Sequence, residues 1–274
     1  MLLALVKGAG DLATGAALSL HRAGFGVVMT EIALPSAIRL TVSFAQAVYD
    51  GSHSVEGVRA VRTDAEGWRA VVEDGAVAVL IDPQATILSQ MPAHVVVDAI
   101  MAKRNTGTGR REGSVVISLG PGFTAGVDVD VVIETERGHE LGRIVRTGTA
   151  REDSGVPGEI GGKGAERVLR APTDGIVIHV KEIGAIVGKG EPVARVGDLT
   201  VTAPFGGCLR GLIHQGLVVR RGMKIGDVDP RGETQYASTV SDKARSLGRA
   251  VLEAALTVGR EKGLFQLGVG VRKP

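Results

Sequence analysis

The sequence predicts an α/β protein in which a parallel sheet, covered on both faces, is followed by a small β domain and a final helix. Two observations carry this prediction. In the first half of the chain, short apolar runs alternate with stretches of helical periodicity, an order that favours a parallel sheet. After residue 170, a short-stranded segment occurs twice with a period of 32 residues, which is typical of two copies that bury their apolar faces against each other.

Composition limits the classes of protein to which the chain belongs. Its 274 residues, 44% of them hydrophobic, are enough for two buried cores, and its 40 glycines predict many tight turns. The formal net charge of +2 gives no reason to expect nucleic acid or a membrane surface as a partner. The single cysteine, Cys208, excludes an intramolecular disulfide. Because no apolar stretch is long enough for a bilayer and the apolar start lacks a basic region, we expect a cytoplasmic protein.

Periodicity places the elements of the first predicted domain, residues 1–150. Residues 11–22 carry an apolar side chain at every fourth position and predict a helix, and the stretch 64–73 is helical as well. Short β-rich runs predict strands at 2–6, 27–30, 76–81, 95–100 and 115–119. Because strands and helices alternate, we expect one parallel sheet with helices on its faces.

The first predicted strand ends in a glycine pattern that is typical of Rossmann-like domains. Gly8, Gly10 and Ala13 satisfy GxGxxG/A between a strand and a helix, and Glu31 ends the next strand. Gly8 permits the turn, Gly10 leaves room for a pyrophosphate, and Glu31 suits a ribose hydroxyl. Asp11 has the wrong charge beside a phosphate, unless it caps the helix or holds a divalent cation. The pattern predicts a dinucleotide or other phosphate ligand, and the alternative is a strand-to-helix turn without a ligand.

A second glycine-rich loop follows the strand at 115–119. Gly120, Gly122 and Thr124 belong to this loop and are further candidate cofactor-binding residues. Ligands of open α/β sheets collect at the carboxyl ends of the strands. We therefore expect this loop and the Gly8–Gly10 loop to face one anion-binding crevice.

A basic segment with threonine and glycine precedes the same strand. It begins with Lys103 and Arg104 and ends with Arg110 and Arg111. Such a segment either binds an anionic small molecule or forms a solvated surface. Lys103 and Arg104 are the predicted side chains of the anion site. Asp98, at the end of its own strand, and Lys103 are candidate catalytic residues, although the pattern shows no reaction.

The acidic segment that follows the second glycine loop is predicted to be structural. Asp128, Asp130, Glu134 and His139 occur within it, but acids alternate with valine as in a half-buried strand and hairpin. The segment has neither HxH nor ExxH spacing, so we predict no metal site.

Residues 151–167 are rich in glycine and charge and predict a linker, and residues 168–232 hold the repeat. The repeat resembles the biotinyl/lipoyl-like barrel-sandwich hybrid, whose carrier lysine lies on the hairpin between the two halves. No lysine occurs between Lys189 and Lys224, and Lys224 lies inside the second copy rather than on that hairpin. The repeat therefore predicts a docking or substrate-covering module without a carrier lysine.

Residues 233–274 predict a C-terminal helix and tail. Between 241 and 258, Leu247, Val251 and Ala255 fall on one helical face, so we expect the helix to pack back on the body.

Several long segments resemble the YqeB-type accessory proteins of the selenium-dependent molybdenum hydroxylase system. They are KGAGDLATG, GFGVVMTEI, RLTVSFAQAVYDG, VVVDAIMAKRN, LGPGFTAGVDVDVVIETERGHELG, GEIGG, RVLRAPTDG and KIGDVDPRG. The resemblance implies a cytoplasmic accessory factor for maturation or insertion of the molybdenum cofactor, with the apo-hydroxylase as partner. It implies neither a reaction nor catalytic residues.

Three functions follow from these observations. In the first, the protein is a maturation factor whose glycine loops hold the phosphates of a nucleotide or pterin. In the second, it is a non-catalytic chaperone or docking protein for the apo-hydroxylase. In the third, it is an NAD(P)-dependent oxidoreductase. The candidate cofactors are accordingly NAD(P), another nucleotide or molybdopterin, while enzymatic activity and oligomeric state stay open.

Overall fold

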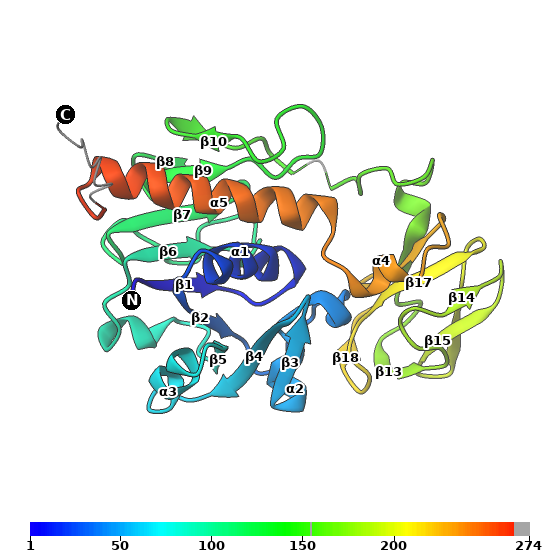
Figure 1. Cartoon of the computed structure of the whole chain (residues 1–274). Helices are drawn as coiled ribbons and strands as arrows, with labels where there is room; N and C mark the ends of the chain where they lie inside the picture. Colours follow the sequence, from blue (N-terminus) through cyan, green and yellow to red (C-terminus); the bar gives the residue numbers. More distant parts are fainter. Residues whose placement is uncertain (154, 266–274) are drawn as a thin grey trace, which may run out of the picture.

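The computed structural model describes residues 1–153 and 155–265 (Figure 1). A large sheet with its helices comes first, two small antiparallel sheets follow, and the last long helix returns to the large sheet. We call the large sheet with its helices the sheet domain, and residues 168–232 the repeat domain.

The large sheet has nine strands in the order β10-β9-β7-β6-β1-β2-β5-β4-β3. Its seven inner strands are parallel, and the edge strands β3 and β10 are antiparallel to their neighbours. Strands β2 to β5 lie on one side of β1, and strands β6 to β10 of this sheet lie on the other side. The strand order therefore reverses at β1. The strands are β1 (Leu3–Lys7), β2 (Gly26–Glu31), β3 (Ser52–Val55), β4 (Val58–Thr63), β5 (Val77–Ile81), β6 (Val95–Asp98), β7 (Val115–Leu119), β9 (Val131–Ile133) and β10 (Ile144–Val145).

Both faces of the sheet are buried, which explains the unbroken apolar runs of its central strands. On β1, Ala4 and Val6 belong to the core that contains α1 and α5, whereas Leu3 and Leu5 belong to the core that contains α3. Side chains alternate between the faces of a strand, so a single apolar run supplies both cores. The helices are α1 (Asp11–Arg22), α2 (Gln46–Asp50), α3 (Trp68–Glu73), α4 (Gln235–Ser238) and α5 (Asp242–Glu261), with short 3-10 helices η1 (Leu40–Val42), η2 (Thr86–Ser89) and η3 (Ala165–Arg167).

Helices α1 and α5 pack directly against each other on one face of the sheet (Figure 1). Their crossing depends on two glycines, Gly15 in α1 and Gly248 in α5. A Cβ at Gly248 would lie 2.1 Å from the Gly15 carbonyl oxygen, and a Cβ at Gly15 would lie 2.3 Å from the Ala244 oxygen. The backbones therefore approach as closely as glycine permits.

The repeat domain consists of two four-stranded antiparallel sheets, β12-β19-β17-β14 and β16-β15-β13-β18, around one core. The first repeat contributes β12 to β15 and the second contributes β16 to β19. Exchange of the repeats converts one strand order into the other, so each sheet takes two strands from each copy. The strands are β12 (Val168–Arg170), β13 (Gly175–His179), β14 (Ile186–Val187), β15 (Pro192–Val196), β16 (Leu199–Thr202), β17 (Gly207–Leu212), β18 (Val218–Val219) and β19 (Lys224–Asp229).

The segment from the end of β2 through α2 contacts the repeat domain and the residues that follow it. Ile38 packs on the core of the repeat domain, and a Cβ at Gly211 in β17 would lie 2.8 Å from the Ile38 carbonyl oxygen. The rings of Tyr49 and His214 stack with centroids 3.7 Å apart. The buried Arg39 donates through Nη2 to two carbonyl oxygens of residues 236 and 239, at 2.7 and 3.1 Å.

The structure confirms a mixed α/β fold with a large sheet, small antiparallel sheets and a C-terminal helix. The helix predicted at 64–73 begins only at Trp68, because the Asp64 carboxylate accepts hydrogen bonds from the Glu66 and Gly67 amides and forms a turn. A further small sheet pairs β8 (Thr124–Ala125) with β11 (Gly148–Thr149). The predicted tail lies outside the described residues from position 266 onward. None of the helices described is both long and apolar enough to cross a membrane.

Candidate functional site

The loops after β1, β6 and β7 meet at the carboxyl edge of the large sheet. Gly8 has a φ of +89°, and a Cβ there would lie 3.0 Å from the Ala99 carbonyl oxygen, so the first two loops touch through backbone. A Cβ at Gly122 would lie 2.5 Å from the Arg104 Cα, so the third loop touches the second in the same way. The structure thus brings together the three loops that the sequence predicts to share a crevice.

A cavity of about 540 Å³ opens where the strand order reverses, and we call it the carboxyl-edge cavity. Its wall combines the glycine turn after β1, the start of α1, the ends of β2 and β6 and their loops. It is lined by Gly8, Gly10, Asp11, Leu12, Ala13, Thr30, Glu31, Ile32, Ser36, Ala37, Pro83, Ala99, Ile100, Met101 and Thr106. Ligands of open α/β sheets bind at this topological position.

Gly10 leaves the approach to α1 open. It is the N-cap of α1 and contributes no side-chain hydrogen bond to the first helical turn, whose amides lack a capping side chain. No atom lies within 4 Å of a Cβ built at Gly10, and its φ of −64° is one that any residue adopts. A larger side chain at this position would therefore fill the cavity without straining the backbone.

Glu31 faces the glycine turn from the end of β2. One carboxylate oxygen accepts a hydrogen bond from the Ala9 amide at 2.8 Å, and the other accepts one from the Ile32 amide at 2.8 Å. The carboxylate thus joins the loop after β1 to the loop after β2 while it lines the carboxyl-edge cavity. A carboxylate keeps further lone pairs after two bonds, so this position still suits a ribose hydroxyl.

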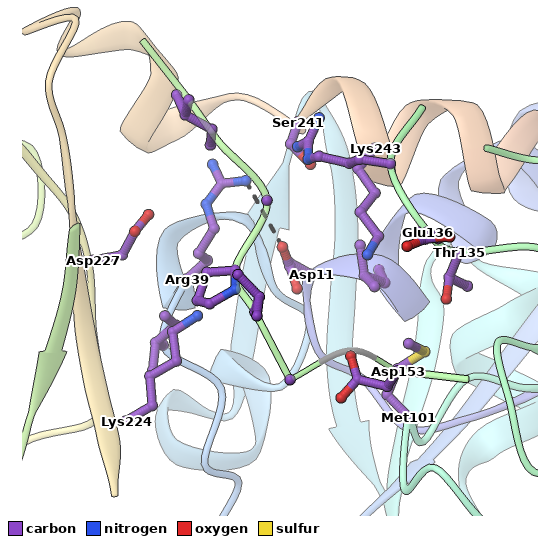
Figure 2. A pocket seen from close by; sticks show the side chains of 18 of the residues that line it. Asp11, Arg39, Met101, Thr135, Glu136, Asp153, Lys224, Asp227, Ser241 and Lys243 are labelled. Carbon is purple, nitrogen blue, oxygen red and sulfur yellow. Dashed lines mark ion pairs between the residues drawn. The ribbon is translucent and has the colours of Figure 1, made fainter. Parts of the chain in front are cut away.

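A second cavity of about 600 Å³ lies between the sheet domain, the 151–167 segment and the repeat domain, and we call it the interdomain cavity (Figure 2). Nine basic and five acidic residues line it. The basic residues are Arg39, Lys103, Arg137, Arg151, Arg167, Arg170, Arg210, Lys224 and Lys243, and the acidic residues are Asp11, Glu136, Glu152, Asp153 and Asp227. Asp11, Leu12 and Met101 line both cavities, so the two adjoin.

Asp11, the residue that opposes a phosphate in the sequence pattern, has a basic partner in the structure. Its carboxylate lies 3.8 Å from Nη1 of Arg39, and it occupies the first turn of α1, where negative charge is favourable. Burial lowers the pKa of Arg39, whereas the Asp11 charge raises it. The negative charge of Asp11, which would repel a phosphate, is therefore partly compensated by Arg39 inside the interdomain cavity.

Lys103 and Arg104 differ in their positions. Lys103 lines the interdomain cavity, but its ammonium pairs with Asp153, and the hydrogen bond from Lys103 lowers the pKa of Asp153. Arg104 is exposed and lines neither cavity. The second predicted loop contributes only Pro121 to the walls of these two cavities, and Gly120, Gly122 and Thr124 line neither. Lys103 and Arg104 were predicted because they closely follow the end of a strand. That proximity in sequence does not determine which side chains of the loop face a cavity.

Asp98 is a structural residue in this geometry. It is 2% exposed and accepts hydrogen bonds from the Thr108 hydroxyl at 2.6 Å and the Ile100 amide at 3.2 Å. Lys7, its neighbour on β1, donates to the same hydroxyl at 2.8 Å and pairs with Glu112 at 2.6 Å. These bonds hold the 99–114 loop over the sheet edge, and they leave Asp98 without access to either cavity.

The acidic segment 128–139 forms part of the hairpin β9–β10, as the alternation predicts. Asp130 pairs with Arg110 at 3.1 Å and Lys262 at 2.6 Å, and the buried Glu134 accepts bonds from the amides of Thr135, Glu136 and Arg151. Within residues 1–153 and 155–265, no group of three His, Cys, Asp or Glu side chains is placed to hold a metal ion.

The sequence reasoning missed three cations of the interdomain cavity. Arg39 comes from an irregular segment, and Lys243 comes from the first turn of α5. Lys224, which does not occupy the carrier-lysine position of the repeat, begins β19 and lines the cavity. The turn between β15 and β16, Gly197 and Asp198, holds no lysine. The sequence did contain one signal for Lys224. At the equivalent position of the first repeat the residue is Pro192, so the lysine is not required by the repeat itself.

Comparison with known sequences connects the chain to one curated protein, and no family model matches it. It is 48% identical over 256 residues to the uncharacterized protein YqeB of Escherichia coli strain K12, an alignment that covers 93% of this chain and 47% of YqeB. The chain therefore spans about half the length of the curated relative that it matches.

Solved structures give only distant likenesses. The product-bound and apo structures of the ectoine utilization protein EutE (DoeB) from Ruegeria pomeroyi have TM-scores of 0.23 and 0.26 and identities of 14% and 12%. These alignments cover 82% and 83% of this chain, and 52% and 85% of the respective EutE chains. Similarity at this level carries no argument about function. The chain is thus similar, over most of its own length, to about half of YqeB.

Proposed function

We propose that the chain is an accessory factor that binds a nucleotide or a phosphate-bearing pterin in the carboxyl-edge cavity, and that it serves the maturation of a molybdenum hydroxylase in the cytoplasm. The observation that carries the binding proposal is the position of the Gly8–Gly10 turn. It opens into a cavity of about 540 Å³ at the point where the strand order reverses, and Glu31, hydrogen-bonded to the Ala9 amide of this turn, lines the same cavity. The molybdenum role rests on the sequence resemblance alone.

The same observations support the finer fold assignment. Parallel strands on both sides of β1, with a glycine turn between β1 and α1, are the features of a Rossmann-like domain. Two four-stranded sheets that exchange strands between repeats are the features of a barrel-sandwich hybrid. We therefore infer a Rossmann-like domain joined to a biotinyl/lipoyl-like domain without the carrier lysine.

Gly10→Val is expected to abolish ligand binding while it leaves the fold intact. A valine side chain enters the open cavity at the start of α1 and occupies the path of a phosphate, while the backbone at residue 10 stays unstrained. The measurement is the thermal stabilisation of the purified protein by NAD(P), other nucleotides and molybdopterin, because a ligand that binds only the native state raises its stability.

Gly188→Val is the matched control. Gly188 is exposed in the repeat domain, has no neighbour closer than 3.8 Å to a built Cβ, and lines neither cavity. The proposal predicts normal ligand response in this control and none in Gly10→Val. An equal response in the two variants contradicts the proposed pocket and favours a ligand-free turn.

A docking role for the repeat domain is the second candidate function. Ile176 and Ile178 on β13 are 52% and 48% exposed, and Val218, paired with Ile176 across the sheet, is 76% exposed. The equivalents of the two isoleucines in the second repeat, Cys208 and Arg210, are buried. Within residues 1–153 and 155–265, one of two related sheet faces is covered and the other is exposed, which favours a protein partner on the exposed face.

Ile176→Glu is expected to weaken binding to an apo-hydroxylase by about tenfold or more, because it places a charge in the apolar patch. The measurement is the affinity of each variant for apo-hydroxylase immobilised on a sensor surface. Leu256→Glu is the control, since Leu256 is 45% exposed but lies on α5, away from this patch. Equal binding by the two variants would assign the exposed isoleucines no role in docking.

A further inference from the structure

Three cations from three separate elements surround Asp11 in the interdomain cavity (Figure 2). Arg39 precedes η1, Lys224 begins β19 of the repeat domain, and Lys243 lies in the first turn of α5. Burial lowers the pKa of all three, and the charge of Asp11 opposes this shift in each of them. Only Arg39 is within ion-pair distance of Asp11, at 3.8 Å.

The two lysines of this group have no partner in the described part of the chain. No described residue forms a hydrogen bond or ion pair with either ammonium, and Arg39 keeps its buried Nε without an acceptor. Lys224 is exposed to the solvent of the cavity, yet the surrounding walls desolvate its ammonium and lower its pKa. Burial also lowers the pKa of Lys243, and Arg137 lowers it further. Among the residues that the structure describes, the two ammonium groups therefore lie in the cavity without a direct acidic partner.

Five of the other six cations form ion pairs, and the sixth, Arg170, donates a hydrogen bond to the Gly222 carbonyl oxygen at 3.0 Å. Arg167 and Arg210 both pair with Asp227, while Lys103 pairs with Asp153. Arg137 pairs with Asp242 and Arg151 with Glu136. Each of these five cations already has an acidic partner, whereas the ammonium groups of Lys224 and Lys243 are available to a ligand that enters from solvent.

We propose that the interdomain cavity binds a diphosphate group, held by Arg39, Lys224 and Lys243. A group with several negative charges suits three converging cations, and its oxygens accept the charge-assisted hydrogen bonds that the two lysines lack. A monocarboxylate would leave most of this charge uncompensated, as Asp11 does. The site draws its cations from both domains, so the bound group joins the repeat domain to the sheet domain. The proposal does not rest on a ligand in the carboxyl-edge cavity.

The test is the affinity of the full chain for inorganic pyrophosphate, measured by isothermal titration calorimetry at fixed ionic strength in the absence of metal ions. We expect Lys224→Gln and Lys243→Gln each to weaken binding about tenfold or more, as for the loss of a hydrogen bond to a charged group. Because neither ammonium has a partner, both variants should keep a melting temperature close to that of the wild type. Lys224→Arg, which retains the charge, should bind more tightly than Lys224→Gln.

Lys189→Gln is the matched control, because Lys189 is exposed in the repeat domain and lines neither cavity. The proposal is overturned if the wild type does not bind pyrophosphate, or if both lysine variants bind as tightly as Lys189→Gln. Neither result bears on the nucleotide pocket, which Gly10→Val tests separately. ADP is titrated in parallel to show whether the diphosphate belongs to a nucleotide. A higher affinity for ADP than for pyrophosphate indicates a nucleotide, and equal affinities indicate free diphosphate. Both outcomes support the site.

Discussion

Gly248→Leu will lower the free energy of unfolding by about 3 kcal/mol or more, because it forces apart two helices that touch through their backbones. The Cβ alone would lie 2.1 Å from the Gly15 oxygen and 2.6 Å from the Ser19 hydroxyl. Intrinsic helix propensity predicts the opposite sign, since leucine is favoured over glycine inside a helix by about 0.8 kcal/mol. The measured sign therefore shows whether packing or propensity controls this position.

Urea denaturation of the variant provides this measurement, with Gly188→Leu as the control at an exposed, unstrained glycine. Buried residues of α1 and α5 belong to the same core cluster as one face of the sheet, so separation of the two helices would disturb that core. A stability equal to or above that of the wild type would show that the two helices separate without cost and that the close approach is not required.

Arg210→Leu will destabilise the protein by about 3–5 kcal/mol, because it leaves two buried carboxylates without their shared cation. Arg210 pairs with Asp227 and, at 3.2 Å, with Asp229, and both aspartates are 1% exposed. Burial raises the pKa of Asp229, and the hydrogen bond from Arg231 together with the charge of Arg210 brings it below its ordinary value. Without Arg210 the pKa of Asp229 rises, so the loss of stability becomes smaller as the pH falls.

Arg59→Leu is the control for this prediction. Arg59 and Asp74 form an ion pair of 2.5 Å in which the side chains are 55% and 68% exposed, and exposed pairs contribute about 0–1 kcal/mol. Unfolding free energies of both variants, measured at neutral and at acidic pH, decide the outcome. Similar losses in the two variants would mean that the buried aspartates find other compensation, with Arg167 and Arg231 as the nearest cations.

Local sequence patterns predicted the elements whose signals are contained in a few consecutive residues. The strand β1, the turn at Gly8 and the helix α1 follow from one apolar run, two glycines and a four-residue period. The repeat likewise shows itself by internal alignment, and the structure places its copies in corresponding strand orders. In each of these cases, neighbouring residues determine the backbone.

The interdomain cavity could not be predicted in the same way. Arg39, Lys224 and Lys243 are separated by up to about two hundred residues of sequence, and only the docking of the repeat domain brings them together. Asp98 shows the same limit, since its position at a strand end suggests chemistry, whereas the structure shows a buried carboxylate that accepts a hydrogen bond from the Thr108 hydroxyl. Which side chains face a cavity depends on tertiary packing, and a single sequence carries little information about that packing.

The return of α5 to α1 has a consequence for synthesis on the ribosome. Residues 1–150 emerge before the repeat domain, but α5 emerges after it, so the small-residue face of α1 lacks its cover until residue 261 has been made. Domains otherwise tend to fold in the order in which they are translated. Here the repeat domain, which has its own core, is free to fold first, and the sheet domain is completed last, although the chain begins in its central strand.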